Sequence, residues 1–226
     1  MLRQYTSVKV TPKAEKSLKN GHPWVFSDEI TEVNGRYENG DIVDVFSAKD
    51  RYLGSGFIND NSKIRVRVIS RNANDKFDEA FYKRRLKYAV DYRKTVMGDD
   101  FSCCRLIFGE ADQFPGLTVD RFSDVLSVQI ACLGIERIKD MLYRSLLQVL
   151  CEYGVNISAI YERNDLAVRS IEGLPQYKGF YEAEGLKKDL SGHVIITENN
   201  IKYDVDYING QKTGFFLDQK YNRAAV

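Results

Sequence analysis

Several features that mark secreted, membrane or repeat proteins are missing from this sequence. The first five residues contain no apolar segment, so no signal peptide is expected. No apolar run approaches the ~20 residues that a transmembrane helix needs, and there is no internal repeat or low-complexity tract. These absences favour a globular, cytoplasmic protein that has no membrane partner.

Residues suited to metal binding or nucleophilic catalysis are also few. The cysteines form no CxxC pair and no other metal-ligand spacing, and the adjacent Cys103 and Cys104 are poorly placed for a disulfide. The only histidines, His22 and His193, stand alone, which gives no support for a hydrolase triad. The single Gly-x-Gly motif, at residues 54–56, precedes no helix and predicts no nucleotide-binding loop. We therefore expect no metal site and a reducing compartment.

The sequence does contain enough apolar material for a core, together with an uneven distribution of charge. Of its 226 residues, 43% are hydrophobic and 29% are charged, which is ordinary for one large or two small domains. Residues 1–106 hold 20 Lys and Arg against 15 Asp and Glu (net +5), whereas residues 107–226 hold 13 against 17 (net −4). A basic first half suits a polyanionic partner such as RNA, although chance variation between two surfaces would look the same.

Hydrophobic periodicity and turn residues divide the chain near residue 72. The first part begins a helix at Thr11-Pro12 and is otherwise β-rich. The second part mixes long helices and strands and closes with a hairpin through Asn199-Asn200. The predicted strands cover residues 5–10, 41–46, 52–58, 64–69, 105–108, 117–122, 125–130 and 157–162, and the predicted later helices cover residues 75–97 and 134–153.

The first candidate functional segment is the basic region that begins at residue 13. One interpretation makes Trp24 and Phe26 core anchors and leaves the lysines as a solvated surface. The other makes the basic side chains an edge that contacts RNA phosphates, which position RNA without reading its bases. The residues of this predicted RNA-binding edge are Lys13, Lys16, Lys19, His22, Arg65 and Arg67.

The second segment, residues 105–121, contains the acidic side chains Glu110, Asp112 and Asp120. No histidine lies nearby, and the spacing matches no known metal-binding loop. A structural turn at Pro115-Gly116 is therefore favoured over an acid–base pair or a metal site.

The third segment, residues 210–219, places an amide, a cation and a hydroxyl on a glycine-flanked turn. Two phenylalanines follow, and then Asp218 is expected to cap a helix that starts at Gln219. The cation and the helix N-terminus favour a carboxylate, and an aromatic edge can pack on a sulfonium. Short polar turns are common, so the residues alone indicate a small zwitterionic ligand only weakly. The sequence stops inside the expected helix, from which we expect a truncated fragment.

The three segments, taken together and in order, resemble the RlmI-like family of large-subunit rRNA cytosine-5 methyltransferases. The matching stretches are residues 22–26, 105–120 and 210–223, and the resemblance extends over essentially the whole chain. It implies an α+β protein with three parts. These are a PUA-type RNA-binding small β-barrel over residues 1–72, a central α/β domain over residues 73–190, and the truncated start of a Rossmann-like methyltransferase domain over residues 191–226.

The resemblance also implies the chemistry. S-adenosyl-L-methionine (SAM) is the expected methyl donor and C5 of an rRNA cytosine the acceptor, and the cysteine nucleophile is expected beyond Val226. This chain should therefore carry no catalytic residue, bind SAM poorly and not methylate. Asp218 and Arg223 are expected to hold the turn and helix in place. The residues matching the family's SAM-pocket segment are Gln211, Lys212, Thr213 and Phe215, and the cysteines expected only to pack are Cys103, Cys104, Cys132 and Cys151.

Two other functions stay open. A non-catalytic PUA-containing RNA-binding or ribosome-assembly module would need the basic first half but would have no use for the polar turn. Alternatively, the central domain serves chiefly as the contact surface of a homodimer.

Overall fold

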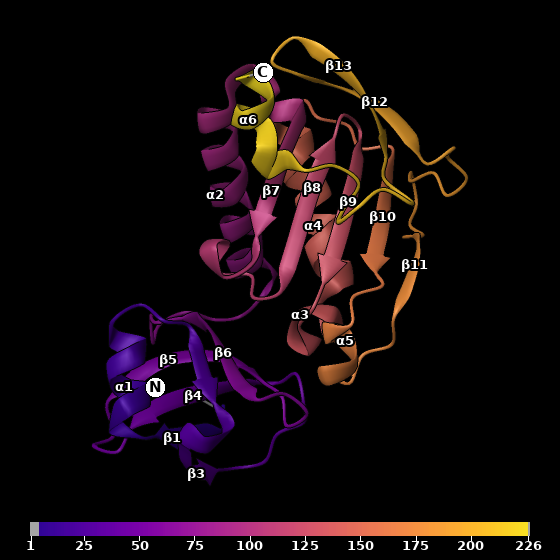
Figure 1. Cartoon of the computed structure of the whole chain (residues 1–226). Coiled ribbons are helices and arrows are strands. Elements are labelled where there is room, and N and C mark those ends of the chain that lie inside the picture. The colour runs from indigo at the N-terminus through magenta and orange to yellow at the C-terminus, as the bar shows by residue number, and fades with distance from the viewer. Residues whose placement is uncertain (1–4, 226) are drawn as a thin grey trace.

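The computed structural model describes residues 5–225, which form two units that meet near residue 72 (Figure 1). The first unit is built on a six-stranded sheet of order β2-β6-β5-β4-β1-β3, and the second on a five-stranded sheet of order β11-β10-β9-β8-β7. A separate hairpin, β12-β13, lies beside the second sheet. Within the described residues, no helix is both long and apolar enough to cross a membrane.

The sheet of the first unit curls around a small apolar core, as expected for a PUA-type β-barrel. β1 pairs in parallel with β4 and antiparallel with β3. Helix α1 (Pro12–Lys19) begins as predicted, because Thr11 Oγ1 accepts a hydrogen bond from the Ala14 N–H at 3.3 Å. The strands are β1 (Ser7–Val10), β2 (Trp24–Phe26), β3 (Ile30–Asn34), β4 (Ile42–Ser47), β5 (Tyr52–Ile58) and β6 (Ile64–Ser70).

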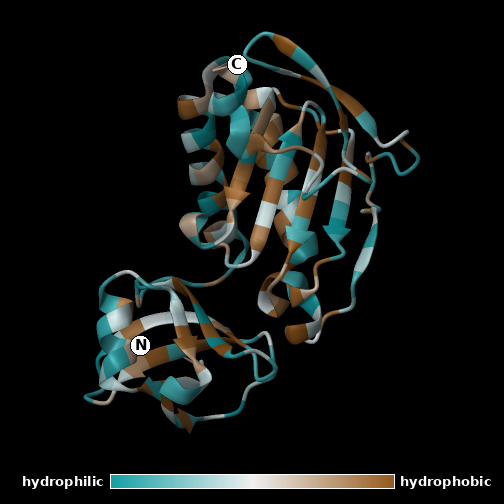
Figure 2. Ribbon diagram, in the orientation of Figure 1, coloured by the Kyte–Doolittle hydropathy of each residue, from teal (hydrophilic) through white to brown (hydrophobic). Residues whose placement is uncertain are grey.

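The second unit packs helices on one face of its sheet. Long helix α2 (Glu79–Met97) lies against α4 (Lys139–Glu152), and the side chains of both enter the main apolar core. Figure 2 shows that apolar segments, in brown, alternate with polar ones along the strands of this sheet. The strands of the second sheet are β7 (Cys103–Phe108), β8 (Leu117–Phe122), β9 (Val125–Ile130), β10 (Ala159–Asn164) and β11 (Tyr177–Phe180). Among them, only β9 and β10 pair in parallel.

One predicted helix, over residues 134–153, is broken in the structure. Ile138 has φ −114° and ψ 9°, outside the helical range, and separates α3 (Leu133–Arg137) from α4. The break turns α3 toward the first unit, where a Cβ built on Gly134 would lie 2.2 Å from the Phe57 ring. Periodicity within the helix could not reveal a contact made by a residue so distant in sequence. A further short helix, α5 (Val168–Ile171), was not predicted.

The hairpin covers the other face of the second sheet. β12 (His193–Glu198) and β13 (Ile201–Asp206) turn through Asn199 and Asn200, both at positive φ, as predicted. Ile196 and Val205 join an apolar cluster with Phe122 of the sheet. The segment that follows ends in a 3₁₀ turn, η4 (Leu217–Gln219), and in helix α6 (Lys220–Ala224).

Candidate functional site

The polar turn predicted from the sequence follows the hairpin, and its backbone is tightly folded. Lys212 has φ 55° and Gly214 φ 129°, and the Gly214 N–H donates to the Gln211 carbonyl oxygen at 2.9 Å. A Cβ at position 210 would lie 2.3 Å from the Asp206 carbonyl oxygen. The glycines on both sides of the turn are therefore required by close backbone contacts.

Thr213 anchors this turn to the second sheet. Its side chain is fully buried and donates to Asp120 Oδ2 at 2.5 Å, while its carbonyl oxygen accepts from Ser127 Oγ at 2.7 Å. Asp120 is itself fully buried on β8, and Arg105 donates to both of its oxygens at 2.8 and 2.9 Å. A buried carboxylate requires such partners. Asp120 therefore has a structural role, as expected, within the strand predicted over residues 117–122.

The remaining residues of the predicted SAM-binding wall divide into exposed and inward-facing ones. Gln211 and Lys212 are exposed, and Lys212 Nζ lies 3.6 Å from Asp218 Oδ1. Phe215 instead packs against the Tyr203 ring at 5.3 Å between centroids. Since Thr213 is also buried, only Gln211 and Lys212 present polar groups to a ligand from this turn.

Arg223 holds the turn and the last helix in place, as expected. It donates to both carboxylate oxygens of Glu198 on β12, each at 2.8 Å, and to the Phe216 carbonyl oxygen at 2.8 Å. Its guanidinium lies 4.2 Å from the centroid of the Phe215 ring. The prediction that Asp218 caps a helix at Gln219 is wrong, because Asp218 lies within η4 and makes no cap hydrogen bond.

Three of the four cysteines are unsuited to nucleophilic attack. Cys103, Cys104 and Cys132 are buried, and burial raises the pKa of their thiols to about 12, about 12 and about 11. Such thiols stay protonated near neutral pH, so they pack as expected. Cys151 is exposed, which contradicts the packing role predicted for it. No cluster of three or more His, Cys, Asp or Glu side chains is arranged to bind a metal within residues 5–225.

The lysines of the predicted RNA-binding edge are exposed on α1. The Lys13 side chain is 82% exposed, and its Nζ lies 3.6 Å from Glu29 Oε1. Lys19 pairs with Glu15 one turn earlier on the helix, and Lys16 is also exposed. His22 follows at the end of α1, exposed, with its ring edge-on to Trp24 at 5.4 Å. These four side chains are accessible to a polyanion.

The two arginines predicted for the same edge differ from the lysines. Arg65 forms an ion pair with Asp60 in the turn between β5 and β6. Arg67 is only 7% exposed and donates to Glu172 Oε1 at 2.9 Å and Glu110 Oε1 at 3.4 Å, both in the second unit. The structure therefore places Arg67 inside the junction between the units and not on an RNA-facing edge.

Trp24 and Phe26 do not anchor the core, so the first of the two interpretations of this segment is wrong for these two rings. Phe26 is 36% exposed. Trp24 lies at the junction, where its Nε1 donates to Glu110 Oε1 at 2.9 Å and its ring lies 5.8 Å from the Arg67 guanidinium. Trp24 thus joins the two units through a polar contact between residues 86 positions apart in the sequence.

Glu172 is the residue of this junction that sequence reasoning missed. It is 1% exposed, and its carboxylate accepts from Arg67 and from Asn59 Nδ2 at 3.0 Å. Burial opposes its ionisation, but the hydrogen bonds and charge of Arg67, with Asn59, outweigh burial and lower the pKa of Glu172. No motif or spacing marked it, because its partners come from a distant part of the chain.

Comparison with known proteins agrees with this architecture. Residues 8–71 match the family model of a PUA-like domain. A ribosomal RNA large subunit methyltransferase I from Shewanella denitrificans is 39% identical over 96% of this chain, and one from Aliivibrio fischeri is 36% identical over 96%. The chain spans about half the length of these curated relatives, 53% in both cases.

The chain is homologous to this methyltransferase family over about half of its members' length. Two solved structures share the fold. One is a Streptococcus mutans protein proposed to be a SAM-dependent methyltransferase, with TM-score 0.76 and 22% identity, covering 97% of this chain and 53% of that one. The other is a proposed methyltransferase complexed with SAH, with TM-score 0.75 and 23% identity, covering 96% and 52%.

Proposed function

We propose that this chain is part of a SAM-dependent methyltransferase that modifies C5 of a cytosine in large-subunit rRNA. Its own contribution is RNA binding by the first unit and one side of the SAM site at the polar turn. The observation that carries the proposal is the likeness to rRNA methyltransferases over 96% of the chain. The PUA-like unit and its exposed lysine helix support the RNA-binding part.

The side chains of the turn fit one end of SAM. Gln211 offers an amide, and Lys212 offers a half-exposed cation whose carboxylate partner, Asp218, is also exposed. These groups fit the polar end of SAM, where Lys212 would pair with its carboxylate. SAM, when bound, supplies the electrophilic methyl group. The residues described give only this side of a site, so we expect the 226-residue chain alone to bind SAM too weakly for calorimetry.

No nucleophile is assigned within this chain. Cysteine-dependent C5 methylation needs a thiolate, and Cys103, Cys104 and Cys132 are buried thiols with raised pKa values. Cys151 is exposed near the end of α4. We expect its replacement by serine to leave methylation unchanged, because the nucleophile would come from another part of the protein.

The test is transfer of a labelled methyl group from SAM to isolated large-subunit rRNA by the protein from the complete reading frame. We expect label in a single cytosine, identified by nuclease digestion and mass spectrometry, and none with the 226-residue chain alone. Label in a different base would overturn the cytosine assignment. Absence of label in rRNA, with SAM bound normally, would overturn the proposed substrate.

A second candidate is a non-catalytic RNA-binding or ribosome-assembly module. The exposed lysines of α1 favour it as much as they favour the enzyme, but it gives no reason for the closely packed turn at residues 210–214. A homodimer formed through the second unit and a cytoplasmic location stay predictions. Size-exclusion chromatography with light scattering would test the first of them.

A further inference from the structure

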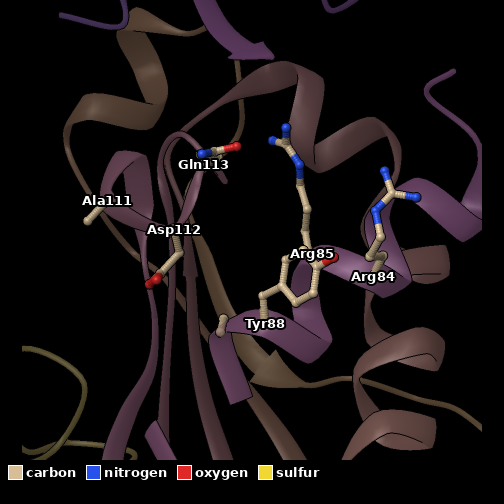
Figure 3. A pocket seen from close by; sticks show the side chains of 7 residues that line it. Arg84, Arg85, Tyr88, Ala111, Asp112 and Gln113 are labelled. Atoms are coloured by element: carbon tan, nitrogen blue, oxygen red, sulfur yellow. The ribbon is translucent and has the colours of Figure 1, made fainter. Parts of the chain in front are cut away.

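A cleft made of two neighbouring hollows lies beside α2 and extends to the junction between the two units. One hollow is lined by Arg84, Arg85 and Tyr88 of α2 and by Gln113 (Figure 3). An adjoining hollow also contains Gln113 and is lined on the first unit by Gly21, Pro23 and residues 68–71. The two hollows share Ala111 and Gln113, and the second one reaches Gly21, next to the exposed His22.

We propose that this cleft binds an unpaired RNA strand, with Tyr88 as the platform on which a base stacks and Arg84 and Arg71 as phosphate contacts. The inference rests on the RNA-binding part of the proposed function and adds a site on the second unit. It places RNA against α2 as well as against the PUA-like unit.

The aromatic platform is the first observation that supports this site. Tyr88 is 63% exposed and lines the first hollow beside Arg84, Arg85 and residues 111–113. The Tyr88 ring is not part of the apolar core. Arg84 lies one helical turn before it on α2. An exposed aromatic ring beside an arginine is the pair of side chains that stacks on unpaired bases, because every base has a π-face.

The charges of the cleft are the second observation. Its acids are already paired: both oxygens of Asp112 accept from Arg93, at 2.9 and 2.6 Å, and Glu110 accepts from Trp24 and Arg67. Arg71 is exposed and has no ion pair within residues 5–225. Arg84 is about half exposed, with its nearest carboxylate 3.7 Å away. The charge that the cleft offers to a ligand is therefore positive, which suits phosphates.

The third observation is the polar group beside the platform. Gln113 is exposed and lines the same hollow as Arg85 and Tyr88 (Figure 3). A side-chain amide can donate to and accept from the edge of a base at once. An unpaired strand fits this arrangement better than a duplex, whose bases are stacked and cannot reach Tyr88.

The test is fluorescence anisotropy of the 226-residue chain with a labelled single-stranded RNA of about 12 nucleotides. We expect Tyr88→Ala to weaken binding about tenfold or more and Tyr88→Phe to restore it, because the stacking face is kept. Arg84→Gln should reduce the slope of log affinity against log salt by about 0.7. Tyr221→Ala, which removes a 79% exposed tyrosine outside the cleft, should change neither value.

The outcomes separate this inference from the proposed function. Binding of RNA by the unmodified chain and by Tyr88→Ala with equal affinity would overturn the cleft and leave RNA binding intact. Failure of the unmodified chain to bind RNA would overturn both. A dimer that Tyr88→Ala converts to a monomer, with unchanged RNA affinity, would show that the face is an interface between copies. Thermal melting followed by circular dichroism would show that each variant is folded.

Discussion

Arg67 and Lys13 both belong to the basic first unit and carry the same charge, but the structure uses them in opposite ways. Arg67 is 7% exposed and binds two carboxylates of the second unit. The Lys13 side chain is 82% exposed, and its nearest carboxylate lies 3.6 Å away. The Arg67 charge is used in the contact between the two units, whereas the Lys13 charge is accessible to a polyanion. Net charge in a stretch of sequence therefore overstates the charge that a partner can use.

The largest expected effect is at the junction. Glu172→Gln keeps the shape of the side chain but removes its charge, so the buried Arg67 guanidinium keeps only one distant carboxylate, Glu110 at 3.4 Å. We expect a loss of about 3 kcal/mol in the free energy of unfolding, measured by urea denaturation. Glu182→Gln, at an exposed pair with Lys188, is the matched control and should change stability by less than about 0.5 kcal/mol. Equal effects at the two positions would remove the distinction between buried and exposed charges.

The apolar part of the junction should respond less strongly. Gly134→Ala would place a methyl group 2.2 Å from the Phe57 ring, across the boundary between the units. We expect destabilisation of about 1–3 kcal/mol and faster proteolysis near residue 72. Gly179→Ala, where a Cβ meets no atom within 4 Å, serves as the control. Unchanged proteolysis in Gly134→Ala would show that the units are not held together through this contact.

The pH dependence of stability tests the same junction without a mutation. The pKa of Glu172 is lowered in the folded protein, so its stabilising effect is fully present above the unfolded value of about 4.3. That effect is lost as pH falls through the lower folded value. The acid loss of stability should be smaller in Glu172→Gln than in the unmodified chain. Identical acid profiles would contradict the assignment. The groups around this carboxylate are Arg67, Asn59, Ser62 and Cys132.

The smallest expected effect on stability is at Lys13, the exposed member of the compared pair. Lys13→Gln should change the free energy of unfolding by less than about 0.5 kcal/mol, because an exposed ion pair contributes little. Glu29 keeps a second partner, the Phe26 N–H at 3.0 Å. A loss as large as that of Glu172→Gln, in the same urea titration, would show that Lys13 is structural.

Local patterns predicted much of the fold. The strands over residues 117–122 and 125–130 were correct to the residue, because alternation and turn residues bound them closely. β2, β3 and β11 were missed, because they are short and partly exposed, and their pairing partners decide their conformation. The break at Ile138 was missed for the related reason that α3 packs against the first unit.

The candidate site was predictable only where its residues lie close together in the sequence. The turn at residues 210–214 was found, but the burial of Thr213 depends on Asp120, 93 residues away. The role of Arg67 likewise depends on Glu172, 105 residues away. Along β6, Arg67 alternates with Val66 and Val68 of the first core, but this alternation does not show that a second unit covers the face on which Arg67 lies.

The salt dependence of RNA affinity tests most directly whether the exposed charges of the first unit bind RNA. The variant replaces Lys13, Lys16 and Lys19 together by glutamate, and the ligand is a labelled fragment of large-subunit rRNA. We expect weaker binding and a slope of log affinity against log salt that is smaller by about 2, since each lost phosphate contact removes ~0.7–0.9. An unchanged slope, in a variant that melts like the unmodified chain, would contradict this role of α1.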